Sequence, residues 1–207
     1  MLKLTAMQVD ALTEIVNIGV GRAASSLSDI IGAHILLKVP AVNIFPLSKL
    51  PDILSSFHNG KLVSVLQGFQ GDFSGTSALV FPPESALRLV TALTGNDSLS
   101  PTMDAVRSGT LVEVGNIIIN AILGTMGNML ESNFIFSLPE YREIKNLADA
   151  IGLDPKSIKE GLILLAEANF NISSLEINGY IFILFKLQSI TNLVDMINHS
   201  IKTSSAT

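Results

Sequence analysis

Two glutamate–asparagine pairs are the residues of this chain whose types and spacing could do chemistry. Glu14 and Asn17 lie three residues apart, and Glu113 and Asn116 repeat that spacing after 99 residues. Residues three apart on a helix share one face, so each pair would present a carboxylate beside a carboxamide. Neither side chain is expected to act as a nucleophile here, so the pattern indicates catalysis by positioning.

An asparagine carboxamide offers a donor and an acceptor on one rigid group, which suits holding a water molecule in line with a phosphorus atom. Phosphoryl hydrolysis depends on positioning and electrostatics, so a partner protein can supply the rest of the site. The carboxylate then suits docking through an ion pair with a lysine of that partner. One carboxylate per pair makes a poor metal site and cannot form a glycosidase pair.

The plain alternative is a solvated helix face, on which Glu and Asn contribute only solubility. Asparagine is a poor helix former, and positions 17 and 116 both accept that cost in mid-helix, which weighs against this reading. Pro40 and Pro139 recur at the same offset of 99 residues. Their plain reading is that each ends a strand, because proline cannot donate to a sheet.

Composition narrows the class of protein. The chain has 207 residues, of which 48% are apolar and 15% charged, so a folded globular protein is expected. The net charge of −5 and the lack of a Lys/Arg cluster argue against a nucleic-acid partner. Without cysteines, and with three scattered histidines, no metal site of its own is predicted.

Membrane insertion and secretion are not expected. The mean hydropathy is +0.49, but the longest apolar runs end well short of the ~20 residues that a membrane span needs. Acidic residues come too early at the N-terminus for a signal peptide. We therefore expect a cytoplasmic protein.

Hydrophobic periodicity predicts the elements that must position the pairs. In the first half we expect a helix from Ala6 to about Ile31, capped by Thr5 and stopped by Gly32. The remaining predictions for that half are strand 34–39, helix 48–56, strands 61–69 and 73–81, and helix 84–94. The second half repeats the order, with helix 103–131, strand 133–138, a helical stretch 141–151, strands 161–170 and 175–187, and helix 190–199.

The repeated order predicts an internally duplicated α/β (α+β) fold. We expect one domain over 1–200, made of repeats at about 6–95 and 103–199, with 201–207 as a flexible tail. The two long motif helices should be exposed, packed on an antiparallel sheet and related by a pseudo-two-fold. A monomer is expected, because the two-fold partner is already in the chain.

At this point the sequence resembles a known family. Asp10, Glu14, Asn17 and Pro40 together resemble the active-site signature of the CheC/CheX/FliY phosphatases of bacterial and archaeal chemotaxis. Glu113, Asn116 and Pro139 repeat it. CheX-type members are shorter and carry one signature, so two signatures in one chain make the resemblance closest to CheC.

The resemblance implies a phosphatase that hydrolyses the aspartyl phosphate of the response regulator CheY. It implies that the Asn orients the attacking water and that the Glu contacts a lysine of CheY. It further implies no cofactor of the phosphatase itself, since the Mg²⁺ is bound by CheY. CheD is implied as a candidate second partner.

This sequence departs from the family pattern at two places. Asp10 fits the Asp or Ser that precedes Glu14 by four residues, but the corresponding position 109 is Gly, flanked by Ser108 and Thr110. An Asp that helps to hold CheD in many CheC chains has its nearest match here in Asn146.

Two alternatives to a CheY phosphatase stay open. One is a weakly catalytic or non-catalytic adaptor that binds CheD or components of the flagellar switch. The other is a phosphatase for a different receiver-domain protein, because the chemistry of the receiver site is shared.

Overall fold

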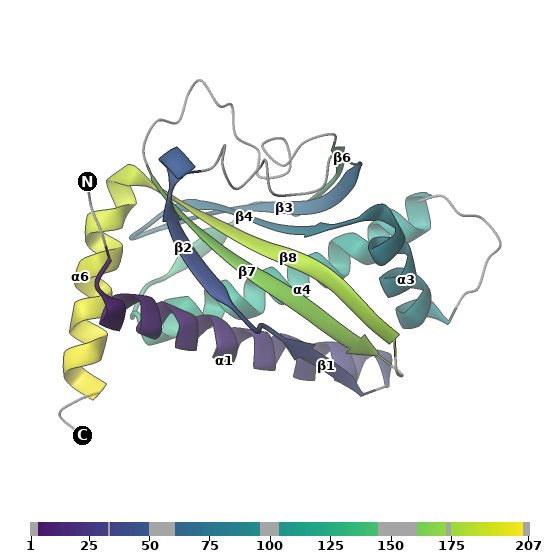
Figure 1. Ribbon diagram of the computed structural model, residues 1–207, viewed down its shortest axis with the longest axis horizontal. Coiled ribbons are helices and arrows are strands. Elements are labelled where there is room, and N and C mark those ends of the chain that lie inside the picture. The colour runs from purple at the N-terminus through teal and green to yellow at the C-terminus, as the bar shows by residue number, and fades with distance from the viewer. Residues whose placement is uncertain are drawn as a thin grey trace.

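The computed structural model describes residues 4–32, 34–49, 61–95, 104–144, 161–172 and 175–204 (Figure 1). Its first long helix, α1, spans Ala6–Ile31 with the predicted bounds. Thr5 and Gln8 form a capping box at its start, and Gly32 ends it in the left-handed conformation with φ 68°.

The second long helix, α4, spans Ala105–Met129. Asp104 caps it by accepting a hydrogen bond from the backbone N–H of Arg107. By length and composition α4 is apolar enough to cross a membrane, but half of its most apolar window is buried inside the protein. Core helices of globular proteins have this same character, so its hydropathy follows from packing.

Within the described part of the chain, eight antiparallel strands form one curled sheet in the order β1-β7-β8-β4-β3-β5, with β2 also on β7 and β6 also on β3. The strands of the first half are β1 (Ile35–Lys38), β2 (Val42–Pro46), β3 (Leu62–Gly71) and β4 (Gly75–Phe81). Those of the second half are β5 (Phe134–Phe136), β6 (Glu140–Ile144), β7 (Gly161–Ile172) and β8 (Leu175–Lys186).

The two halves exchange strands. β1 and β2 pair with β7 of the second half, while β5 and β6 pair with β3 of the first. β4 and β8 meet at the centre of the sheet. This reciprocal pairing confirms the predicted α+β fold with a pseudo-two-fold, and it joins both repeats in one sheet.

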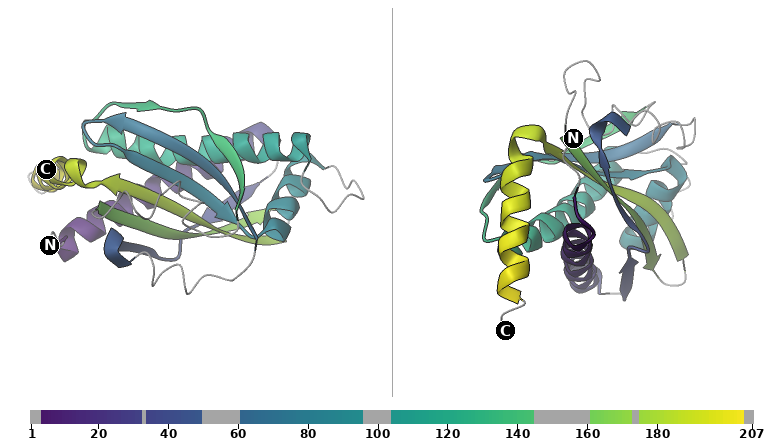
Figure 2. Two further views of the ribbon diagram at one scale, coloured as in Figure 1. Left: turned by 90° about the horizontal axis from the view of Figure 1, so that it is seen from above. Right: turned by 60° about the vertical axis from the view of Figure 1, so that its left-hand side comes forward.

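Both long helices pack on the same face of the sheet, and α3 (Pro83–Thr94) and α6 (Leu187–Ser204) lie at its two ends (Figure 1). The right-hand view of Figure 2 shows α1 almost end-on below the strands, with α6 alongside. The buried apolar side chains of both helices and of the facing strand positions form one core. A smaller buried cluster covers the opposite face of the sheet.

The main differences from the predictions are four. Strand β2 lies where no element was predicted. The stretch predicted as helix 141–151 begins instead as strand β6, because its backbone pairs with β3 from Leu62 to Leu66. Helix 48–56 is reduced to a 3-10 turn at Leu47–Lys49 within the described part of the chain, and residues 50–60 and 145–160 lie outside it. α6 continues to Ser204, into the segment expected to be a flexible tail.

Candidate functional site

The first motif lies along one exposed stripe of α1. Asp10, Glu14 and Asn17 are all solvent-exposed, while Leu12, Ile15 and Val16 between them are buried against the sheet. Within the described residues, neither Glu14 nor Asn17 makes a side-chain hydrogen bond. The pair therefore stands free on a rigid scaffold, open to a partner.

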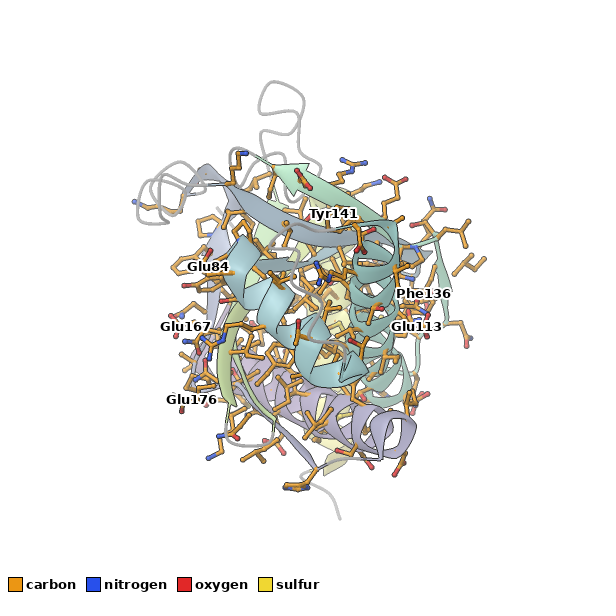
Figure 3. The ribbon with its side chains drawn as sticks, turned by 90° about the vertical axis from the view of Figure 1, so that its right-hand side faces the viewer. Glu84, Glu113, Phe136, Tyr141, Glu167 and Glu176 are labelled. Atoms are coloured by element: carbon orange, nitrogen blue, oxygen red, sulfur yellow. The ribbon has the colours of Figure 1, made fainter. Side chains whose placement is uncertain are left out.

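The second motif occupies the corresponding stripe of α4, but its asparagine is not free. Glu113 is exposed, whereas Asn116 is half-buried. The Asn116 Oδ1 accepts a hydrogen bond of 2.8 Å from Nδ2 of Asn120 and a longer one of 3.4 Å from Nε2 of Gln67 on β3. Figure 3 shows Glu113 projecting outward from α4 on the same side of the molecule as Phe136 of β5.

The strand–turn segment before Pro139 completes this second site. The Gln67 Nε2 also donates to the carbonyl oxygen of Ser137 at 3.0 Å. The Ser137 hydroxyl in turn accepts from the backbone N–H of Gly68 at 2.9 Å. Asn116 is therefore linked through Gln67 to the turn that carries Pro139.

Both prolines lie between two strands. Pro40 is exposed between β1 and β2, and Pro139 is half-buried between β5 and β6. This confirms the plain reading that each ends a strand, since proline cannot continue the ladder.

The hydroxyls beside Gly109 do not replace the missing acidic residue of the second motif. Ser108 Oγ donates to the carbonyl oxygen of Ala105, and Thr110 Oγ1 donates to that of Val106. Both hydroxyls thus bond within the first turns of α4, while Gly109 itself is exposed. Asp10 has no acidic counterpart on the second motif stripe.

The two motif helices run in opposite directions. α1 begins beside α6, where Gln8 Nε2 donates to Asn198 Oδ1 at 2.9 Å. α4 ends beside α6, where Met129 and Met196 line one groove. The start of α1 and the end of α4 therefore lie at the same end of the molecule (Figure 1).

One titratable group close to the second site has a displaced pKa. Burial raises the pKa of the Tyr141 phenol to about 12, and the negative charge of Glu143 adds to the rise. The Tyr141 hydroxyl donates to Glu143 Oε1 at 3.3 Å. Tyr141 lies on β6, which pairs with the same strand as Gln67.

Sequence reasoning missed Gln67, Asn120 and Ser137. Gln67 carries a signal, because it is a large polar residue within the mostly apolar strand β3 and is only 2% exposed. Asn120 lies one turn after Asn116, a spacing at which helical side chains meet. Within the described residues, no group of His, Asp or Glu side chains could hold a metal ion.

Chemically, each site offers a carboxylate for a cation and a carboxamide for a water or an oxyanion. The carboxylate can attract a lysine or arginine of a docking partner. The carboxamide can position a water without forming a covalent intermediate. The arrangement fits a reaction whose electrophile and remaining catalytic groups belong to the partner.

Known families match both halves of the chain. A CheC-like family model matches residues 7–44, which include the first motif, and a model of the chemotaxis phosphatase CheX matches residues 63–153, which include the second. The CheY-P phosphatase CheC of Bacillus subtilis (strain 168) is 26% identical over 136 residues, which cover 64% of this chain and 65% of that protein.

Two further matches extend over almost the whole chain. The flagellar motor switch phosphatase FliY of Bacillus subtilis (strain 168) is 24% identical over 200 residues, which cover 95% of this chain and 51% of that protein. The chain thus spans less than two thirds of either curated relative. The crystal structure of Thermotoga maritima FliY has a TM-score of 0.75 at 20% identity, covering 96% of this chain and 100% of that one, and shows the shared fold.

Proposed function

Because the chain belongs to the CheC/CheX/FliY family of chemotaxis proteins, we propose that it accelerates hydrolysis of the aspartyl phosphate of a CheY-type response regulator. The observation that carries the proposal is the carboxylate–carboxamide pair on one face of each motif helix, Glu14 with Asn17 and Glu113 with Asn116, of which Asn116 is half-buried and the other three side chains are exposed. The names of the two curated relatives, a CheY-P phosphatase and a flagellar motor switch phosphatase, support the same activity.

In this mechanism the motif helix docks against the phosphorylated receiver domain. The carboxylate of Glu14 or Glu113 pairs with a lysine of the receiver and fixes the approach of the helix. The carboxamide of Asn17 or Asn116 then orients a water in line with the phosphorus atom. Mg²⁺ held by the receiver neutralises the phosphoryl oxygens, so this chain supplies positioning alone.

The proposed setting is cytoplasmic signalling, with the chain acting as a monomer on a phosphorylated receiver. Asp10 supports the first motif stripe as an additional exposed carboxylate. CheD remains a candidate second partner. The residue that bears on it, Asn146, lies outside the described residues.

A second candidate function is a flagellar-switch adaptor with little catalysis. The match to a flagellar motor switch phosphatase over 95% of this chain favours it. It is distinguished from the first by the lifetime of the phosphoryl group. An adaptor would bind the receiver or a switch component and leave that lifetime unchanged.

The decisive test is loss of phosphate from a CheY-type receiver phosphorylated with acetyl phosphate. We expect the wild-type chain to shorten the phosphoryl lifetime, and the double variant Asn17→Ala/Asn116→Ala to lose the effect while keeping its circular dichroism spectrum and melting temperature. Asn128→Ala is the matched control, because Asn128 is an exposed asparagine of α4 that belongs to neither signature. Full activity in the double variant would refute the assignment of the asparagines.

A further inference from the structure

The two sites share a signature but differ in what surrounds the asparagine. Asn17 is exposed and unbonded within the described residues, while Asn116 is held by Asn120 and Gln67. The counterpart of Asn120 one turn after Asn17 is Gly21. The two sites therefore differ in residues that lie outside the signature.

The strands repeat this contrast. On β3, Gln67 has the same orientation as Val65 and Phe69, which belong to the core beneath the helices. On β7, the residue at the offset of 99 from Gln67 is Ala166, which belongs to the same core. The fold therefore does not require a polar side chain at the position of Gln67.

The amide cluster of Gln67, Asn116 and Asn120 has an energetic cost. Oε1 of Gln67 and Oδ1 of Asn120 are buried and accept no hydrogen bond from the described residues. A buried acceptor without a donor destabilises a protein. An apolar residue at the position of Gln67 would avoid that cost, as Ala166 does at the equivalent position of β7, and a function of the cluster would account for it.

The hydrogen bond from Gln67 to the Ser137 carbonyl determines how the amides of the cluster are oriented. The Ser137 carbonyl can only accept, so the Gln67 group facing it must be the Nε2 donor. That nitrogen also faces Asn116, which therefore turns its Oδ1 inward. Among the described residues nothing accepts a hydrogen bond from Nδ2 of Asn116, so Nδ2 is the atom of the carboxamide left to hold a water. The chain thus holds this group in one orientation before a partner arrives.

We propose that Gln67 and Asn120 are positioning residues that preorganise Asn116, making the second site the faster of the two. This inference rests on the proposed function and assigns residues to it. A free asparagine such as Asn17 must be ordered during docking, whereas Asn116 is already ordered. Glu113 is outside the cluster, so the cluster acts on the reaction step and not on docking.

The test uses the full chain with one site disabled at a time, against a CheY-type receiver phosphorylated with acetyl phosphate. In the Asn17→Ala background, Gln67→Met and Asn120→Ala should each lower the maximal rate of phosphate loss roughly fivefold, the loss that one ordinary hydrogen bond represents. The chain concentration that gives half the maximal rate should change little. In the Asn116→Ala background the same substitutions should have no effect.

Two results would overturn the proposal. One is an unchanged or higher maximal rate on breaking the cluster in the Asn17→Ala background. The other is an equal loss in both backgrounds, which would mean a general structural effect, and thermal melts of each variant measure that effect directly. The methionine preserves the approximate volume of Gln67 and removes its donor, which limits such damage.

A second measurement does not depend on catalysis. In ¹⁵N–¹H spectra of the free chain, the side-chain NH₂ group of Asn116 should relax as an ordered group and that of Asn17 as a mobile one. Gln67→Met should make Asn116 mobile. If no variant affects the phosphoryl lifetime but Asn116 is ordered, the proposed function is refuted, whereas the ordering of Asn116 by the amide cluster is confirmed. If Asn116 is as mobile as Asn17, the proposal that the amide cluster orders Asn116 is refuted.

Discussion

Gly19 of α1 lies directly against the backbone of Ile122 of α4. A β-carbon at position 19 would stand 2.6 Å from the Cα of Ile122, a distance at which backbone must move. The two motif helices therefore cross with their backbones in contact. This crossing fixes where the two sites lie relative to one another, because each motif is on one of the two helices.

The first prediction concerns this crossing. Gly19→Ala should destabilise the protein by about 1–3 kcal/mol, the usual range for overpacking a filled interior, because the added methyl meets backbone and not a flexible side-chain end. Chemical denaturation monitored by circular dichroism measures the free energy of unfolding.

Gly21→Ala is the matched control for helix propensity. Gly21 is exposed, and a β-carbon there would meet nothing within 4 Å. Alanine at that position should stabilise the helix by up to about 1 kcal/mol, since glycine is the poorer helix former. Equal stabilisation by both substitutions would show that α1 and α4 are not in close contact.

The second prediction concerns Tyr141. Burial raises the pKa of its phenol from an ordinary value of 10.0 to about 12, and Glu143 adds to the rise. Because the folded-state pKa is the higher one, the stabilising contribution is complete below pH 10. It is lost as the pH rises from about 10 toward 12, since the unfolded chain then releases the proton more readily.

Phenolate absorbance tests this directly. In the Tyr180→Phe variant, Tyr141 is the remaining tyrosine and should ionise near pH 12 in the folded protein. The free energy of unfolding of the wild type should fall more steeply above pH 10 than that of Tyr141→Phe. Ionisation of the folded variant at the ordinary tyrosine pKa would contradict the buried contact with Glu143.

Much of the fold could be predicted because its local signals agree. Thr5 and Gly32 set the ends of α1, and apolar spacing set its buried face. Ile30 is an exception, since it continues the apolar spacing of Ala23 and Leu27 but is 66% exposed. The repeat of 99 residues predicted the duplicated fold, which holds through the exchange of strands between the halves.

The errors arise where long-range pairing overrides local preference. Residues 140–144 contain Glu, Arg and Tyr in a pattern compatible with a helix, but the edge of β3 provides backbone partners for them from Leu62 to Leu66. No local property of that segment indicates which strand lies beside it. Propensity is a weak guide when such an edge is available.

The sequence predicted only those parts of each candidate site that lie on a single helix. The spacing of Glu14 with Asn17 and of Glu113 with Asn116 placed each pair on one helical face, and both faces are accessible. Gln67 lies 49 residues from Asn116 in sequence, so its role depends on how β3 packs under α4. The difference between the sites therefore needed three-dimensional contacts.

The third prediction transfers half of the Asn116 arrangement to the first site. Gly21 lies one turn after Asn17, as Asn120 lies one turn after Asn116, and it is exposed with open space around it. In the Asn116→Ala background, Gly21→Asn should raise the maximal rate of receiver dephosphorylation, by no more than about fivefold, because one new hydrogen bond can order the Asn17 carboxamide.

Gly21→Ala in the same background separates positioning from helix stability. It should stabilise α1 without raising the rate, because alanine has no group that can bond to Asn17. The comparison of the two variants at saturating chain concentration isolates the effect of the added carboxamide. If both substitutions raise the rate equally, helix stability sets the activity, and a neighbouring amide does not order the asparagine. If neither raises it, the Asn120 bond alone is insufficient, and the ordering of Asn116 depends on Gln67 beneath it.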